Sequence, residues 1–200
     1  VKESIKLILL SGGHTSNSFF GTEFLFDDGN AKVAYLCYQQ NNYLPCVNQK
    51  PTLIADLENE IKNYISSDVE TCFDEMSSSF EKQGYDVNQE YNGFEVKLFP
   101  RKIAIQIDSK ITLTKSDETT TQENFEIITL TRIYEILQVV QEAVNKEISI
   151  CDFNHRAYEL LYPKFKIEKF VKIDSTKIYT IENQNSKEKF RFAVRGCVIP

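Results

Sequence analysis

Residues 91–115 read YNGFEVKLFPRKIAIQIDSKITLTK, and this stretch decides the fold class. Apolar and polar side chains alternate along it, which is the period of two that a strand shows when one of its faces is covered. The alternation resumes at Phe125, after a polar run over residues 116–124 that is expected at the tip of a hairpin. These segments predict an antiparallel meander with one covered face and one wet face. The alternating positions are Phe94, Val96, Leu98, Ile103, Ile105, Ile107, Ile111, Leu113, Phe125, Ile127 and Thr129.

Helical periodicity flanks the meander on both sides. Pro51 suits a helix start and Gly84 a helix end. Between them, residues 66–68 (Ser-Ser-Asp) offer a second N-cap, so this segment forms either two helices or one long helix with a kink. After the meander, helical periodicity returns over residues 133–144, and Asp152 is expected to cap a further short helix. The apolar stripes are Leu53, Leu57, Ile61 and Ile65, continued by Val69, Cys72, Phe73, Met76 and Phe80, and then Ile133, Ile136, Leu137, Val140 and Val144.

Both ends of the chain have the character of strands. Residues 19–39 are expected to form a hairpin about a turn at residues 27–30 (Asp-Asp-Gly-Asn), and alternating apolar residues predict further strands between Phe165 and Val194. Runs of strands separated by blocks of helices are typical of an α+β fold rather than an α/β fold. We therefore expect residues 1–200 to form a single α+β domain, an antiparallel sheet meander with helices packed on one face.

The composition argues against several classes of function. The net charge of −6 disfavours nucleic acid as a partner, because binding to phosphates needs a basic face. No apolar run reaches the roughly 18 residues that a membrane-spanning helix needs. The chain opens at Val1 without an initiator methionine, so a link to a membrane is expected only through a segment that would precede it.

No metal site, cofactor site or catalytic centre is expected. The two histidines, His14 and His155, have no zinc-ligand spacing with the cysteines, which include no C-x-x-C pair. Cys151 and His155 would share a helix face as nucleophile and base, but a packing or disulfide role for Cys151 is favoured. The sequence contains no nucleophile elbow, Walker loop, dinucleotide fingerprint or zincin motif, so we do not expect an enzyme.

Five scattered cysteines without metal-ligand spacing indicate oxidised structural cysteines, and therefore an exported protein, extracellular or at the cell surface. Two disulfides are expected, one between Cys72 and Cys151 and one between Cys37 and Cys46. Cys197 is then left over and is expected to be unpaired, or to pair with another molecule or a segment outside this chain. The alternative is that all five are reduced and serve as small apolar core residues.

Two apolar features are candidates for contact with other molecules. Aromatic residues crowd the 19–39 hairpin, and a surplus on its outer face would form an adhesive patch, although core packing is favoured. The apolar segment 1–11 could insert into a neighbouring subunit or lie next to an anchor, although burial in its own chain is favoured. The assembly candidates are Ile5, Leu7, Leu9 and Leu10, and the aromatic residues are Phe19, Phe20, Phe24, Phe26, Tyr35, Tyr38 and Tyr43.

Several short motifs spread over the chain together resemble the motifs of one group of proteins. They are LENEIKNYI at residues 57–65, Cys72-Phe73, QGYDV at 83–87, ITLTK at 111–115, RIYEI at 132–136 and KFRFAVR at 189–195. With these motifs the chain resembles uncharacterised membrane-anchored ectodomains, surface or pilin-like proteins of small-genome archaea of the DPANN type. The resemblance covers most of the chain and implies a short hydrophobic segment before the ectodomain, but no catalytic residues. Such proteins often carry a cysteine near the start of the ectodomain, where this chain has Ser4.

These observations predict a non-enzymatic structural or interaction protein at the cell surface or outside the cell, such as a subunit of a filament or an envelope. Its expected partners are proteins, either further copies of the same chain or neighbouring surface proteins. The alternative is a soluble extracellular module that binds or adheres to a glycan, a peptide or a small ligand.

Overall fold

The structure is a computed structural model that describes residues 6, 8–14, 20–26, 29–116 and 118–198. These residues form helices packed against mainly antiparallel sheets, so the α+β class expected from the sequence is confirmed. The strands divide between two sheets, where the sequence analysis expected one. None of the helices in these ranges is long and apolar enough to cross a membrane.

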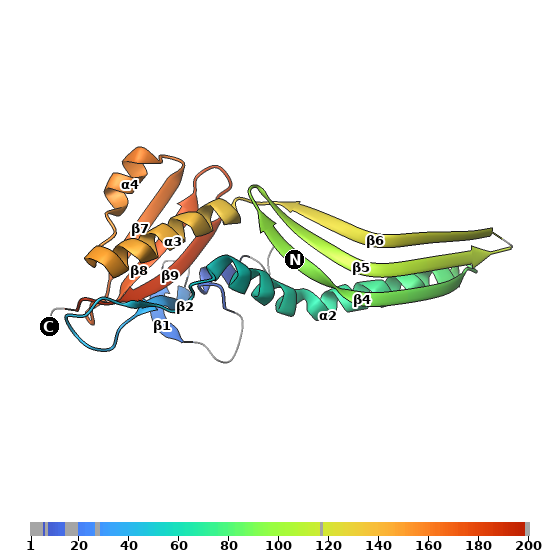
Figure 1. Cartoon of the computed structure of the whole chain (residues 1–200), viewed down its shortest axis with the longest axis horizontal. Coiled ribbons are helices and arrows are strands. Elements are labelled where there is room, and N and C mark those ends of the chain that lie inside the picture. Colours follow the sequence, from blue (N-terminus) through green and yellow to red (C-terminus); the bar gives the residue numbers. More distant parts are fainter. Residues whose placement is uncertain (1–5, 7, 15–19, 27–28, 117, 199–200) are drawn as a thin grey trace.

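The molecule is elongated, with a wide end that we call the head and a narrow extension that we call the arm (Figure 1). The arm consists of α2 (Leu53–Lys82), β4 (Asp86–Phe99), β5 (Lys102–Lys115) and β6 (Glu118–Leu130). The head consists of β1 (Gly21–Phe26), β2 (Gly29–Tyr38), β3 (Val47–Asn48), α3 (Ile133–Ile150), α4 (His155–Leu161), β7 (Phe165–Val171), β8 (Lys177–Asn183) and β9 (Lys189–Arg195).

The arm begins with one long helix. The stretch with two possible N-caps forms a single helix of 30 residues, α2, rather than two helices. The residues of its predicted apolar stripe are buried, and Ile61 and Ile65 have no exposed surface. Gly84 follows the helix with a φ of 84°, and the Tyr85 N–H donates to the Phe80 carbonyl at 3.2 Å. This backbone pattern is that of a Schellman cap, in which glycine adopts the left-handed conformation without strain.

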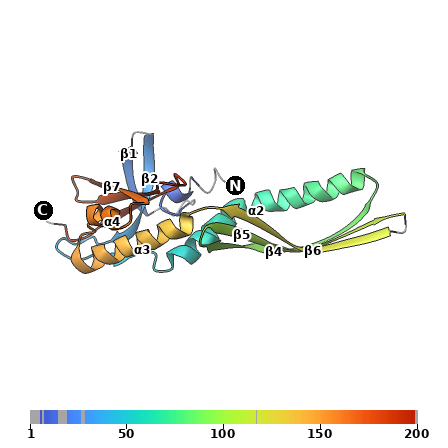
Figure 2. The same cartoon turned by 90° about the horizontal axis from the view of Figure 1, so that it is seen from above.

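The strands β4, β5 and β6 form an antiparallel sheet, and α2 lies along β4 (Figure 1, Figure 2). The alternating apolar residues of β4 and β5 are largely buried, as their period of two predicts. The polar run expected at the hairpin tip is mostly strand, because residues 118–123 pair with residues 110–115 of β5. Cross-strand hydroxyl contacts favour this pairing, such as the 3.2 Å contact between Thr112 and Thr121.

The head sheet has the strand order β1-β2-β9-β8-β7, with β3 paired to β2. Its pairs are antiparallel except β2–β9, which is parallel and joins the N-terminal hairpin to the C-terminal strands. The helix α3 contacts β9, β8 and β2, so it covers the centre of this sheet (Figure 1). The sequence predicted the hairpin and the C-terminal strands separately but not their union, since pairing between distant segments leaves no local pattern.

The N-cap of α4 differs from the expected one. Asn154, not Asp152, caps this helix, because the Asn154 Oδ1 accepts a hydrogen bond from the Ala157 N–H at 3.0 Å. Asp152 instead pairs with Lys169 of β7 at 2.5 Å, and this hydrogen bond lowers the pKa of Asp152. Asp152 therefore ties the connection between α3 and α4 to the head sheet.

The hydrophobic core runs continuously from the head into the arm and includes the N-terminal residues Ile8 and Leu9, which are 1% and 3% exposed. Burial of Leu9 in its own chain is the favoured expectation from the sequence, and it leaves this assembly candidate no free side chain for a neighbouring subunit. Leu10 is partly buried. The other two assembly candidates, Ile5 and Leu7, lie outside the described residues.

Candidate interaction surface

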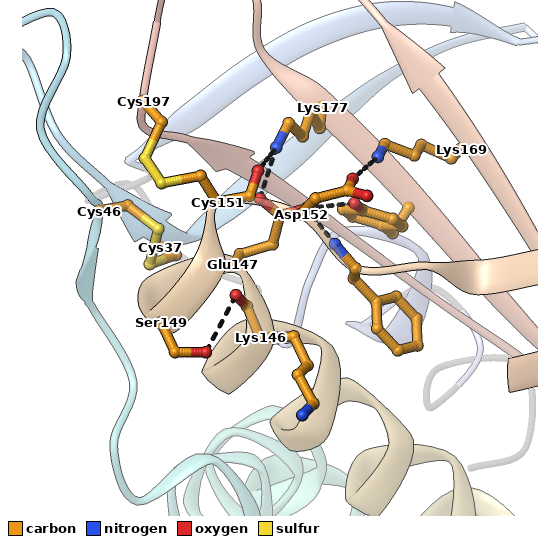
Figure 3. Close-up of polar contacts among 12 residues, drawn as sticks. Cys37, Cys46, Lys146, Glu147, Ser149, Cys151, Asp152, Lys169, Lys177 and Cys197 are labelled. Atoms are coloured by element: carbon orange, nitrogen blue, oxygen red, sulfur yellow. Dashed lines mark hydrogen bonds and ion pairs between the residues drawn. A yellow bond between two sulfur atoms is a disulfide. The ribbon is translucent and has the colours of Figure 1, made fainter. Parts of the chain in front are cut away.

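The cysteines pair partly as expected. Cys37 and Cys46 are bonded, with their Cα atoms 5.3 Å apart, as the sequence analysis anticipated. The expected bond between Cys72 and Cys151 is wrong, because Cys151 is bonded to Cys197, with Cα atoms 5.8 Å apart (Figure 3). Cys197 is therefore not left over. Cys72 belongs to α2, which runs along the arm whereas α3 lies in the head (Figure 1), and it is free and exposed.

A thiol reagent is expected to label Cys72 alone in the native, non-reduced protein, because Cys72 is free and exposed. Alkylation followed by mass spectrometry of the peptides measures which cysteines react. Reduction before alkylation should make the four bonded cysteines reactive as well. Labelling of Cys197 in the native protein would contradict the observed pairing.

The disulfide removes the nucleophile that the sequence suggested. Cys151 bonded to Cys197 offers no thiolate, so it cannot act with His155 as a nucleophile and base. Burial, followed by the charges of Lys169 and Arg156, lowers the pKa of His155. No group of three or more His, Cys, Asp or Glu side chains within the described ranges could hold a metal ion.

A buried polar cluster surrounds Glu147 near the end of α3 (Figure 3). Its carboxylate is 2% exposed and accepts hydrogen bonds from the Lys177 Nζ at 2.6 Å, the Tyr179 hydroxyl and the Phe153 N–H at 3.1 Å. Burial, followed by the charge of Glu147, raises the pKa of Tyr179 well above its usual range, so this hydroxyl stays a donor. These contacts join α3 to β8, and we interpret the cluster as structural rather than catalytic.

The aromatic residues of the hairpin are shared between core and surface. Their rings form two groups, Phe20 with Tyr35 and Tyr38, and Phe24 with Phe26 and with Phe170 of β7. Tyr35 is buried, whereas Phe20 and Tyr43 are 47% and 67% exposed. Phe19 lies outside the described residues. Most of these rings pack against one another, and Phe24, Phe26 and Tyr38 stay partly exposed.

The edge strands of the two sheets differ in whether side chains hydrogen-bond their backbone groups. An edge strand presents unpaired backbone groups that can pair with another chain, and proteins ordinarily block such edges. On three edge strands of this molecule, a side chain from a neighbouring segment hydrogen-bonds one backbone group. Glu58 of α2 accepts from the Leu98 N–H of β4 at 2.7 Å, Glu159 of α4 accepts from the Ile167 N–H of β7 at 2.7 Å, and Lys172 donates to the Glu23 carbonyl of β1 at 3.2 Å.

The strand β6 forms the free edge of the arm, on the opposite side of the sheet from β4 and α2 (Figure 1). The Thr131 N–H donates to the Arg101 carbonyl at 3.0 Å, so antiparallel alternation directs the backbone N–H and C=O groups of Ile128 and Leu130 away from β5. Within the described part of the chain, no side chain hydrogen-bonds the backbone of residues 125–130, which we call the β6 edge. The β6 edge is therefore open to another strand.

Apolar side chains are exposed on both faces of the β6 edge. Ile127 and Ile128 are each 50% exposed, and Leu130 is 81% exposed. Ile127 lies opposite the buried Ile105, but α2 packs mainly on β4 and leaves Ile127 partly uncovered. Leu130 shares the other face with Phe99, which is 40% exposed. The sequence signal for this surface was the adjacent pair Ile127-Ile128, which interrupts the alternation and directs one apolar side chain to each face.

The charge of β6 is of one sign. The strand carries Glu118, Glu123 and Glu126, and it contains no lysine or arginine. Glu123 forms an ion pair with Lys110 of β5 at 2.8 Å. A strand that paired with β6 would therefore meet exposed apolar side chains toward the head, and farther out mainly neutral polar side chains together with Glu118 and Glu123.

Comparison of the chain with protein-family models, with curated proteins and with solved structures gave no match. The resemblance to archaeal membrane-anchored ectodomains therefore stays a prediction, and the function has to be argued from the surface of the molecule.

Proposed function

We propose that this chain is an exported, non-enzymatic interaction protein at the cell surface or outside the cell, and that it binds another protein by strand addition to the β6 edge. The observation that carries this proposal is a contrast between edge strands. A side chain hydrogen-bonds a backbone group at the edge of each of β1, β4 and β7, whereas among the described residues no side chain does so at the β6 edge, which also exposes apolar residues. In strand addition, main-chain hydrogen bonds supply affinity and alternate side chains supply specificity.

The proposed location is supported by the two disulfides. Bonds such as Cys37–Cys46 and Cys151–Cys197 are compatible with an oxidising environment, as found outside the cell. The membrane-anchored archaeal ectodomain expected from the sequence motifs would have this location, and this origin remains a prediction.

Charge complementarity favours one kind of partner. A second copy of β6 would bring acidic strands together, and like charges on neighbouring strands are destabilising. We therefore assign the β6 edge to an extended segment of a different protein. That segment would carry apolar side chains beside Ile128 and Leu130, and Lys or Arg beside the glutamates of β6. Self-assembly through this edge, as in a filament, is the alternative that the test distinguishes.

Peptides selected from a random phage-displayed library on the disulfide-bonded protein are expected to alternate apolar residues with Lys or Arg. Ile128→Pro should weaken the binding of these peptides at least about tenfold, because it removes an outward N–H at an edge position that tolerates proline. Fluorescence polarisation with synthetic copies of the selected peptides measures the change.

Two matched variants, Ile128→Lys and Leu160→Lys, distinguish peptide binding at the β6 edge from non-specific binding to exposed apolar residues. Each replaces an exposed apolar residue by lysine, and Leu160 lies on α4 with 85% of its surface exposed. Only Ile128→Lys should weaken peptide binding. Peptides that bind Ile128→Pro as tightly as the parent protein would contradict strand addition. A dimer in sedimentation velocity that Ile128→Lys dissociates would overturn our choice of partner and assign the edge to a second copy.

A further inference from the structure

A cavity of about 820 Å³ lies where the arm meets the head, and the proposed strand addition does not require it. Its walls come from the turn between β4 and β5, the end of β6 with the start of α3, the turn between β8 and β9, and helical residues near the N-terminal end. Cavities that hold small molecules in proteins commonly have volumes of roughly 300–1,000 Å³. The size of this cavity therefore suits a ligand rather than a few waters.

The wall of the cavity is basic although the protein is acidic. The chain has a net charge of −6, yet five cationic side chains line the cavity against one carboxylate, that of Glu188. Glu188 is already engaged, because the Thr131 hydroxyl and the Arg132 backbone N–H donate to its two oxygens. The cationic residues are Lys6, Arg101, Arg132, Lys187 and Lys189.

The positive charge of this wall is only partly neutralised by nearby carboxylates. Three cations have partners: Arg132 pairs with Glu135 at 2.8 Å, and Lys187 and Lys189 share Glu182 at 3.5 and 3.1 Å. Because two lysines share one carboxylate, an excess of positive charge remains between them. Among the residues that the structure places, no carboxylate lies within ion-pair distance of Lys6 or Arg101. An anion in the cavity would supply the missing negative charge.

Arg101 is held on the cavity wall in a backbone conformation that arginine ordinarily avoids. It occupies the second position of the two-residue turn Pro100-Arg101, with a φ of 71°. Proline followed by a residue of positive φ matches a type II turn, in which glycine or asparagine is usual at the second position. Strained positions of this kind concentrate at ligand sites, where the side chain is needed for another reason.

We infer that this cavity binds an amphipathic anion, a molecule with an apolar tail and a phosphate or carboxylate head. Arg101, with the neighbouring lysines, supplies donors for the charged head. Leu130, which is 81% exposed, and the partly buried Leu10 line the same cavity and supply apolar contact for the tail. An inorganic anion would leave these leucines uncovered, and an uncharged apolar ligand would leave the cations without a counter-charge.

Decyl phosphate, used below its micelle concentration, is expected to bind the disulfide-bonded protein with one site in isothermal titration calorimetry. Inorganic phosphate and decyl maltoside carry the head and the tail separately, and each should bind at least about tenfold more weakly. Added salt should weaken the binding of decyl phosphate, because it screens the charges on the wall. Equal binding of inorganic phosphate would reduce the site to a simple anion site and overturn the inference.

Arg101→Gly separates a role in binding from a role in folding. Glycine adopts a positive φ freely, so the thermal midpoint should stay the same or rise, while the dissociation constant for decyl phosphate should increase about tenfold. Ser175→Gly is the matched control, because Ser175 also has a positive φ, 61°, but does not line the cavity. This variant should leave binding unchanged. Unchanged binding in Arg101→Gly would contradict the inference.

Leu130 belongs to both the β6 edge and the cavity wall, but the variants that test the two proposals change other residues, so the proposals can fail independently. Ile128 does not line the cavity, so Ile128→Pro should leave the affinity for decyl phosphate unchanged. Arg101→Gly should likewise leave the binding of strand-like peptides unchanged. A loss of both activities in both variants would indicate unfolding of the junction and would contradict two separate sites.

Discussion

Lys177→Met is expected to lower the free energy of unfolding by about 3–5 kcal/mol, because it removes one partner of a buried ion pair. The side chain of Glu147 is 2% exposed and that of Lys177 is 15% exposed, with 2.6 Å between Nζ and Oε2. Without the ammonium group, the carboxylate would stay buried with the Tyr179 hydroxyl and the Phe153 N–H but without a positive charge. Urea denaturation at neutral pH measures the change.

Two further variants identify the cause of this loss. Lys166→Met removes the lysine of an exposed ion pair with Glu168 and is expected to leave the stability nearly unchanged. Addition of Glu147→Gln to Lys177→Met should restore much of the lost stability, because the amide oxygen still accepts hydrogen bonds and carries no charge. An unchanged denaturation midpoint in Lys177→Met would show that this ion pair does not hold α3 to β8.

Loss of the bond between Cys151 and Cys197, in a variant with both replaced by alanine, is expected to lower the free energy of unfolding by about 4 kcal/mol. The bond joins residues separated by 46 positions, and its removal frees a long loop in the unfolded chain. The bond between Cys37 and Cys46 spans 9 positions, and the same chain-entropy relation assigns it about 2.5 kcal/mol. Chemical unfolding without reductant, followed by circular dichroism, measures both effects.

Cys72→Ala is the matched control for the disulfide variants. Because Cys72 is free and exposed, its replacement is expected to leave the unfolding midpoint unchanged. A loss as large as that of the variant with Cys151 and Cys197 both replaced by alanine would indicate that Cys72 is bonded to Cys151, as expected from the sequence. In that case the observed pairing with Cys197 would be wrong.

Much of the local structure of this protein could be predicted from its sequence. The alternation around Ile103 and Ile105 predicted buried strands, and the stripe from Leu53 to Ile65 predicted the first half of α2. The bond between Cys37 and Cys46 was also predictable, because a turn between nearby residues brings them together. In each case the interacting residues are close in the sequence, so a periodic pattern or a turn pattern indicates the contact between them.

Contacts between distant parts of the chain could not be predicted in this way. The bond between Cys151 and Cys197 depends on the parallel pairing of β2 with β9 and on the position of α3, neither of which a local pattern specifies. The sequence favoured burial of Leu9 in its own chain, but its apolar neighbours give no information about which elements cover it. The basic cavity combines Lys6, Arg101 and Lys187, which come from three separate segments of the chain.

The β6 edge shows, within one strand, what the sequence determines and what the tertiary structure determines. The amino-acid sequence alone determined that β6 is acidic, that it alternates as a strand, and that Ile127 and Ile128 place apolar side chains on opposite faces. Only the tertiary structure decided that this strand lies at an open edge, because α2 packs along β4, at the other edge of the same sheet, where Glu58 also accepts from the Leu98 N–H. A periodic pattern reflects residues that are neighbours in the sequence, whereas the covering of a sheet edge depends on which distant element packs against it.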